Sequence, residues 1–270
     1  MTIVFQWTVA DLDALMSCCE RTDIKPLVEK YLPAGGHVLE AGCGVGQWVR
    51  YLEQRGFRAT GIEIAPETVK MALDHWPGLD LRVGDVANMD FPDNTFDAAL
   101  SLGVVEHWPE GPAAPLKELH RVLKEGGIAL ITVPCHDTVR EWKRRLWIDE
   151  AYMTARAVRN FLRRRPTGHT CFRLHPEYKY RVFPAVGTFF EYRLRPAEFR
   201  REVENAGFEV FDHQPVGVLD GVYHELNPFK LLIKFRDWTF YPTRAGLALH
   251  RWLSRKPFRS THMQAIMARK

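Results

Sequence analysis

The stretch Val38-Leu39-Glu40-Ala41-Gly42-Cys43-Gly44-Val45-Gly46 decides the fold of this chain. Its apolar start is typical of a buried strand, which ends near an acid and is followed by glycine at alternate positions. Residues 47–52 continue with helical spacing, so the run predicts a strand, a turn and a helix. Because glycine carries no Cβ, the backbone of such a turn can approach a ligand closely, and the first N–H groups of the helix face that ligand.

The spacing of the glycines narrows the kind of nucleotide site. The dinucleotide fingerprint is G-x-G-x-x-G. Here the third glycine, Gly46, comes one position early, and Gln47 occupies the place of the last fingerprint glycine. This spacing argues against a nicotinamide cofactor, although an oxidoreductase on a similar sheet stays an alternative function.

Strands and helices alternate after this turn. The strands are predicted at residues 37–40, 59–64, 79–83, 96–101, 128–133, 208–211 and 262–268, and the helices at 46–55, 66–75, 115–124 and 196–205. Such alternation predicts parallel βαβ units and therefore an α/β fold with a doubly wound, Rossmann-like sheet. In these sheets ligands bind at the carboxyl ends of the strands.

The same pattern divides the chain into a core, a lid and two insertions. Residues 35–135, 191–216 and 261–270 are predicted to form the core, and residues 1–34 a helical lid over the first sheet edge. Residues 136–190 and 217–260 interrupt the alternation. We expect them to pack together as a helical cap over the site, with an aromatic-rich loop after the basic helix of the first insertion.

The composition limits the cellular setting. Of the 270 residues 46% are hydrophobic, which is ordinary for a globular protein. No uninterrupted apolar run approaches the roughly 18 residues of a spanning helix, and the first residues lack the pattern of a secretion signal. The five cysteines show no C-x-x-C spacing and the 11 histidines no metal-ligand spacing. The expectation is a cytoplasmic protein with reduced thiols and no metal site.

Several motifs, in this order along the chain, resemble those of the class I S-adenosylmethionine methyltransferases. They are Glu40 to Gly46, Glu63, Gly84-Asp85-Val86, Phe96-Asp97-Ala98, Val105-Glu106-His107 and Leu123-Lys124-Glu125-Gly126-Gly127. Within that class they are similar to the "type 11" group, which includes the ubiquinone and menaquinone methyltransferases. The likeness covers residues 35–134 densely, returns at 192–199 and 206–208, and fails over both insertions. It implies a seven-stranded sheet with an antiparallel last strand, and S-adenosylmethionine as the cofactor, with S-adenosylhomocysteine as the product.

The ends of the predicted strands then assign the cofactor contacts. Glu63 is placed to accept hydrogen bonds from the ribose diol, Asp85 from the adenine amino group with Val86 beside the ring. Glu40 is expected to face the methionine amine, directly or through water. A solvated acid at a strand end is the alternative for Glu63, and a plain turn aspartate for Asp85. The full set of predicted cofactor-binding residues is Glu40, Gly42, Cys43, Gly44, Gly46, Glu63, Ile64, Asp85, Val86 and Leu102.

Two histidines are the candidates for a general base. His107 follows the fourth predicted strand and is the first candidate, and His136 follows the fifth and is the second. The alternative for His107 is that it only lines the cofactor pocket or caps a turn. Cys135 is not predicted as a nucleophile, because direct transfer of a methyl group needs no covalent intermediate.

The segment from Arg140 to Arg165 carries the positive charge of the chain. It holds nine Lys and Arg against three acids, an excess of six, with tryptophan and leucine between the bases. Such a helix can lie on an anionic membrane, or its apolar face can cover the site while its bases are solvated. The second interpretation is favoured, since packing is the commoner use of an apolar stripe.

These features lead to one expected function and two alternatives. The expectation is O-methylation of a small-molecule or lipid-linked acceptor by in-line transfer. Nucleic acid is argued against, because Ser101-Leu102-Gly103-Val104 stands where nucleobase amino-methyltransferases carry an Asn/Asp-Pro-Pro-aromatic tetrad. The alternatives are a nicotinamide-dependent oxidoreductase and a non-catalytic partner protein at the inner face of a membrane, which it would contact through residues 140–165.

Overall fold

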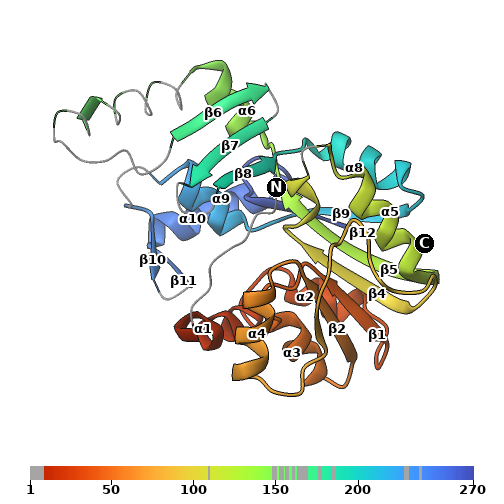
Figure 1. Ribbon diagram of the computed structural model, residues 1–270. Helices are drawn as coiled ribbons and strands as arrows, with labels where there is room; N and C mark the ends of the chain where they lie inside the picture. Colours follow the sequence, from red (N-terminus) through yellow and green to blue (C-terminus); the bar gives the residue numbers. More distant parts are fainter. Residues whose placement is uncertain are drawn as a thin grey trace.

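A mixed α/β architecture confirms the predicted fold class. The computed structural model describes residues 9–108, 110–147, 170–175, 178–183, 187–227, 231–236 and 239–270, with single residues at 151, 155, 158, 159 and 162. Over these ranges helices flank a seven-stranded sheet, and the elements of both insertions gather on one side of it (Figure 1). No helix in these ranges is both long and apolar enough to span a bilayer.

The central sheet has the strand order β3-β2-β1-β4-β5-β12-β9. Its strands are β1 (His37–Ala41), β2 (Arg58–Glu63), β3 (Leu81–Val83), β4 (Phe96–Leu102), β5 (Leu123–Pro134), β9 (Glu209–Val216) and β12 (Met263–Arg269). All neighbours pair in parallel except β12, which is antiparallel to both β5 and β9. The antiparallel last strand that the resemblance implied is therefore confirmed. Strand order reverses between β1 and β4, and this reversal marks the switch point at which such sheets bind ligands.

The strands are buried on both faces, as parallel strands with helices on each side must be. Val38 and Leu100 face one apolar cluster, and their neighbours Leu39 and Ala99 face the other. Helices α1 (Val9–Cys19), α3 (Gln47–Glu53) and α4 (Pro66–His75) contribute buried residues to the first cluster, as does α2 (Lys25–Tyr31). Helices α5 (Ala113–Val122) and α8 (Pro196–Asn205) contribute to the second.

The N-terminal helices differ from the predicted lid over a sheet edge. Leu12 and Leu15 of α1 lie in the same apolar cluster as Trp48 and Tyr51 of α3. The helix therefore belongs to the layer on one face of the sheet, because its apolar residues are buried there. Helix α1 ends at Cys19, and Pro26 lies in the first turn of α2, where a proline is tolerated.

The two insertions contain β-structure as well as helices, so the expectation of a helical cap is wrong in part. The first insertion has α6 (Thr138–Arg145) and an antiparallel sheet of β6 (Thr170–His175), β7 (Tyr178–Phe183) and β8 (Gly187–Tyr192), which replaces the predicted loop. The second has α9 (Val218–Glu225), the hairpin β10 (Ile233–Arg236) and β11 (Thr239–Pro242), and α10 (Arg244–Ser254).

The hairpin occupies residues whose apolar spacing is typical of a helix. Phe235 and Phe240 are cross-strand partners with ring centroids 4.8 Å apart, so aromatic packing between the strands stabilises the pair. A short apolar run satisfies both periods, and the local sequence cannot choose between them. The helical spacing was that of Phe229, Leu232, Ile233 and Phe240, of which Phe229 lies outside the described residues.

Candidate functional site

Most of the predicted cofactor residues meet at one edge of the sheet. Strands β3, β2, β1 and β4 are consecutive neighbours and run in the same direction. Their carboxyl ends therefore bring the glycine turn, Glu63, Asp85 and Leu102 to the same edge. This juxtaposition is what a ligand across the first strand ends requires.

The glycine turn accepts only glycine at two of its positions. Gly42 has a φ of +80°, and a Cβ there would lie 2.6 Å from Cγ2 of Val104. Gly46 has a φ of +75°, and a Cβ there would lie 2.8 Å from Cδ2 of Leu81. Both the backbone conformation and the close neighbours exclude a side chain. The turn is therefore a tight backbone surface against the ends of neighbouring strands.

Backbone hydrogen bonds fix the turn to β2. The N–H groups of Gly42 and Cys43 both donate to the carbonyl of Ile62, at 2.9 and 2.8 Å. The Cys43 side chain is buried, and a Cβ at Gly61 would lie 2.7 Å from its Sγ. Burial raises the pKa of the Cys43 thiol well above its usual range, so this side chain is an apolar filler.

Glu63 connects the turn with the end of β2. Its Oε2 accepts from the Gly44 N–H at 3.0 Å and its Oε1 from the Ala65 N–H at 3.1 Å. Each carboxylate oxygen has two lone pairs, so both oxygens keep capacity for a further donor such as a sugar hydroxyl. Glu63 and Ile64 are both partly exposed, which leaves them accessible to a ligand.

Asp85 closes the same edge at the end of β3. Its Oδ1 accepts from the Ala87 N–H at 2.8 Å, as a turn aspartate does, and in the described ranges its Oδ2 has no hydrogen bond. Val86 beside it is 4% exposed. The Gly84 N–H donates to the carbonyl of Glu63 at 3.0 Å, which holds the ends of β2 and β3 together. One oxygen thus shapes the turn while the other stays available as an acceptor.

Glu40 is almost completely buried, whereas direct contact with a charged amine would require only partial burial. Its side chain is 3% exposed, and its Oε2 accepts from the Val49 N–H at 3.2 Å. Burial raises the pKa of this carboxyl well above its usual range. Its contact with the methionine end of a cofactor stays a prediction.

The end of β4 leads into a short 3-10 helix, η1 (Val105–His107), which carries the first candidate base. His107 is partly buried, and its Nε2 lies 3.9 Å from Oε1 of Glu106. Glu106 is 2% exposed, and no hydrogen bond reaches its Oε2 in the described ranges. Burial raises the pKa of Glu106 well above its usual range. A buried carboxyl thus lies beside His107, and the sequence motif that contained it gave no sign of its burial.

His136 lies on the neighbouring strand end, after β5. Its Nε2 is 2.9 Å from Oε2 of Glu141, and its backbone N–H donates to the carbonyl of Leu194 at 2.9 Å. Burial lowers the pKa of His136, and the contact with Glu141 partly opposes this shift. Because β4 and β5 are parallel neighbours, both candidate histidines follow strand ends at the same edge.

A buried charge cluster, which sequence reasoning missed, joins both insertions to this edge. Arg140 is 4% exposed, and its Nε donates to Glu225 at 2.8 Å, as does Lys143. Arg140 also donates to the backbone carbonyls of Cys135, Thr261 and His262. Arg140 and Lys143 hold the pKa of Glu225 far below its usual range. Arg140 and Glu225 are 85 residues apart in the sequence, so no local pattern predicts their contact.

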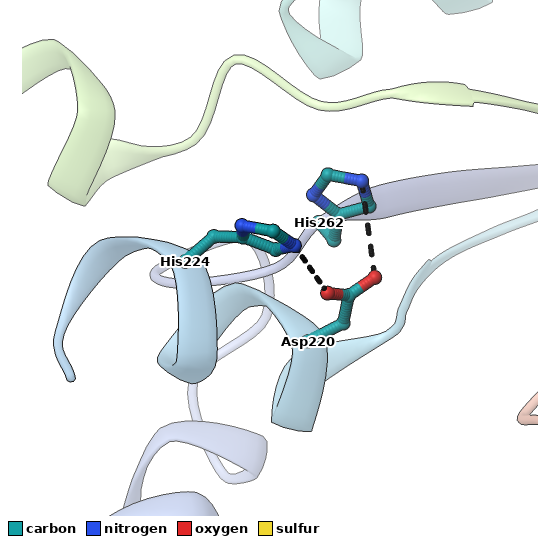
Figure 2. Close-up of side chains that lie close together, drawn as sticks. All are labelled: Asp220, His224 and His262. Carbon is teal, nitrogen blue, oxygen red and sulfur yellow. Dashed lines mark ion pairs between the residues drawn. The ribbon is translucent and has the colours of Figure 1, made fainter. Parts of the chain in front are cut away.

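Asp220, His224 and His262 form a second polar cluster beside Arg140 (Figure 2). The two imidazole rings are stacked, and the Asp220 carboxylate bridges them at one side, 3.0 Å from Nε2 of His224 and 3.8 Å from Nε2 of His262. Their ligand atoms lie within 4.8 Å of one another, close enough for one cation. However, Nδ1 of His262 is 3.1 Å from Nη2 of Arg140, which can only donate. The neutral ring therefore carries its proton on Nε2, the atom that a cation would need.

Residues 39–131 match the family model described as a methyltransferase domain. The 2-methyl-6-phytyl-1,4-hydroquinone methyltransferase of Synechocystis is 40% identical over 104 residues, which are 37% of this chain and 32% of that protein. The ubiquinone biosynthesis O-methyltransferase of Xanthomonas axonopodis is 26% identical over 185 residues, 67% of this chain and 65% of that protein. This chain spans 32% to 42% of the length of the first three curated relatives that it matches.

A solved structure extends the likeness of fold to nearly the whole chain. The S-adenosylmethionine-dependent methyltransferase from Methanosarcina mazei superposes with a TM-score of 0.56 at 19% identity, over 91% of this chain and 97% of that one. At this identity the likeness shows the fold alone. Residues 39–131 therefore match a methyltransferase domain, and the chain around them has the fold of an S-adenosylmethionine-dependent methyltransferase.

Proposed function

We propose that the protein transfers a methyl group from S-adenosylmethionine to an oxygen atom of a small-molecule or lipid-linked acceptor. One observation carries the proposal: the glycine turn, Glu63 and Asp85 lie at the ends of three adjacent strands. A close backbone surface and two acceptor side chains fit a nucleoside with a ribose diol and an amino group.

S-adenosylmethionine supplies an activated methyl group when it is bound. The chain contributes position: the Gly42 turn offers its backbone, Glu63 keeps lone pairs for the ribose, and Asp85 keeps one oxygen for the adenine amino group. Correct orientation of two reactants contributes roughly 7–11 kcal/mol to catalysis in well-ordered systems. We therefore assign most of the rate enhancement to positioning.

His107 is the proposed acceptor of the proton from the substrate hydroxyl. It follows β4, the strand beside β1, and Val104 of the same loop contacts the glycine turn. His136 is the second candidate, and its lowered pKa keeps the ring neutral at neutral pH, as a base requires. Since Nε2 of His136 contacts Glu141, Nδ1 is the atom that would take a proton.

The names of the relatives support the class of acceptor. One is named for a 1,4-hydroquinone, and the other is named as an O-methyltransferase of ubiquinone biosynthesis. The hydroxyl of such a ring is a nucleophile that a histidine can deprotonate. Because the likeness fails over the insertions, the proposal names a hydroxyl-bearing acceptor class and no single compound.

Titration calorimetry with S-adenosylmethionine and S-adenosylhomocysteine tests the cofactor. We expect micromolar binding that Glu63→Ala weakens by about tenfold or more, since it removes the ribose acceptor and the Gly44 contact. Glu67→Ala is the matched control, because Glu67 is an exposed acid four residues away. Absence of binding to the wild-type protein, or equal losses for both variants, would contradict the proposal.

Two further measurements separate the alternatives. An NADH fluorescence change on mixing would favour the oxidoreductase. Cofactor binding without methyl transfer to any hydroxylated aromatic or lipid-linked acceptor would favour the non-catalytic partner. Labelled methyl groups found on nitrogen or carbon of the product would contradict O-methylation while leaving the cofactor assignment intact.

A further inference from the structure

Exposed apolar side chains are concentrated on the two insertions. Among the described residues, Val9, Val83 and Phe211 are the large exposed apolar residues outside them. Those inside the insertions are Trp142, Leu146, Trp147, Val158, Leu162, Leu231, Phe235, Tyr241, Leu247 and Trp252. Large apolar residues normally scatter over a surface, so a concentration of this kind marks an interaction site.

Helix α6 and the residues after it show the arrangement most clearly. Trp142 is 61%, Leu146 51% and Trp147 69% exposed. The buried side of the same segment holds charges, since Arg140 and Lys143 are bound there by Glu225. The interpretation favoured from the sequence, an apolar face that covers the site, therefore fails for these residues.

The charge around these side chains is positive. Arg145 is 73% exposed, and although its Nε binds Glu141 at 2.9 Å, the rest of its guanidinium faces solvent. Arg159 is exposed near Val158 and Leu162. On the second insertion Lys234, Arg236 and Arg251 are exposed near the remaining apolar residues. Tryptophan favours the boundary between water and lipid, and Lys and Arg bind anionic head groups. Another copy of this chain would bring the same positive charge and would be repelled.

We propose that the surface formed by Trp142, Arg145, Leu146 and Trp147 docks on an anionic lipid bilayer. The contacts of Arg140 and Lys143 with Glu225 join α6 to α9, so this surface is held firmly on the second insertion. In Figure 1 both insertions lie on the same side of the central sheet. This docking is independent of methyl transfer and needs no cofactor.

Sedimentation of the full chain with vesicles tests the proposal. We expect binding to vesicles of phosphatidylcholine and phosphatidylglycerol, none to phosphatidylcholine alone, and loss of binding when salt rises from about 50 to 500 mM. Trp142→Ala with Trp147→Ala lowers the partition coefficient by about tenfold, because the anchors of the interface are removed. Arg145→Glu lowers it by about fivefold or more, since one positive charge is lost and a negative one added.

Matched variants on the opposite part of the molecule are the controls. Phe211→Ala removes an exposed aromatic ring from β9, and Arg201→Glu reverses an exposed charge on α8. Both are expected to leave vesicle binding unchanged. Equal effects of the control and α6 variants, or equal binding to neutral vesicles, would overturn the proposal. So would a dimer that the tryptophan variant dissociates, because the surface would then join two copies. Unchanged cofactor binding by each variant confirms its folding.

Discussion

The two halves of the sheet build their parts of the site by different means. At the ends of β1 to β3 the site is made of backbone and of carboxylates that shape local turns, such as Glu63 on the Gly44 N–H. At the ends of β5, β9 and β12 it is made of buried charges, such as Arg140 and Glu225, from segments far apart in the chain. A nucleoside is the same in every enzyme of the class, whereas acceptors differ. We therefore propose that the local turn holds the constant ligand and that the assembled charges lie on the side of the variable acceptor.

The largest effect is expected in the charge cluster. Glu225→Ala leaves Arg140 buried without its ion pair, and removal of one partner from such a pair costs about 3–5 kcal/mol. Urea denaturation measures the loss of unfolding free energy. Arg200 and Glu204 form an exposed pair, so Glu204→Ala is the control, with an expected loss of at most about 1 kcal/mol. Equal losses in the two variants would mean that burial does not distinguish the cluster.

The second effect tests the backbone-built half. Gly42→Ala places a methyl group 2.6 Å from Val104 at a φ of +80°, with an expected loss of about 2–4 kcal/mol and weaker cofactor binding. Gly56→Ala is the control, because Gly56 has a similar φ of +83° but nothing within 4 Å of an added Cβ. We expect only about 1–2 kcal/mol there. Thermal denaturation and calorimetry compare the two, and equal results would show that the contact with Val104 is unimportant.

The smallest expected effect is the pH dependence of stability that His262 causes at the ends of β5, β9 and β12. Burial, with Arg140 nearby, lowers the pKa of His262 from 6.5 to about 4. Between these two pH values His262 is protonated in the unfolded chain and neutral in the folded chain. The unfolding free energy is therefore highest above pH 6.5 and falls on acidification. The contribution of His262 is roughly 2 kcal/mol, reduced because the side chain keeps 29% exposure. Unfolding free energies of His262→Gln measured from pH 7 to 4 should show a shallower slope, whereas His250→Gln should retain the wild-type slope.

The sequence predicted the elements around the glycine turn closely because their signals are local. Helix Pro196–Asn205 and the beginnings of α3 and α4 carry their signals within a few residues. The acids that meet the glycine turn could be placed because parallel strands end at one edge. Glu40 shows the limit of this reasoning: the sequence places it at the turn, while burial decides that its carboxyl faces the interior.

The insertions were harder to predict because their order depends on distant partners. The antiparallel sheet β6–β8 and the β10–β11 hairpin replace a predicted loop and helix. The apolar spacing within one segment does not reveal which other segment it pairs with as a strand. Part of the basic segment, including residues 148–150 and 163–165, lies outside the described residues. Helix α6 has an amphipathic sequence pattern, but only the position of Glu225 determines which side is buried.

The doubly wound sheet, the glycine turn and the carboxylates beside it could be predicted from the sequence, because each follows from short-range periodicity and from the geometry of parallel strands. The folded structure was needed to show which charges are buried and which face of α6 meets solvent. It also shows that Nδ1 of His262 faces Arg140, so that the proton lies on Nε2. These features depend on contacts across 80 or more residues, such as the 82 between Lys143 and Glu225 and the 122 between Arg140 and His262. The energies of these contacts depend on the desolvation of the charged groups, which occurs only when the chain folds.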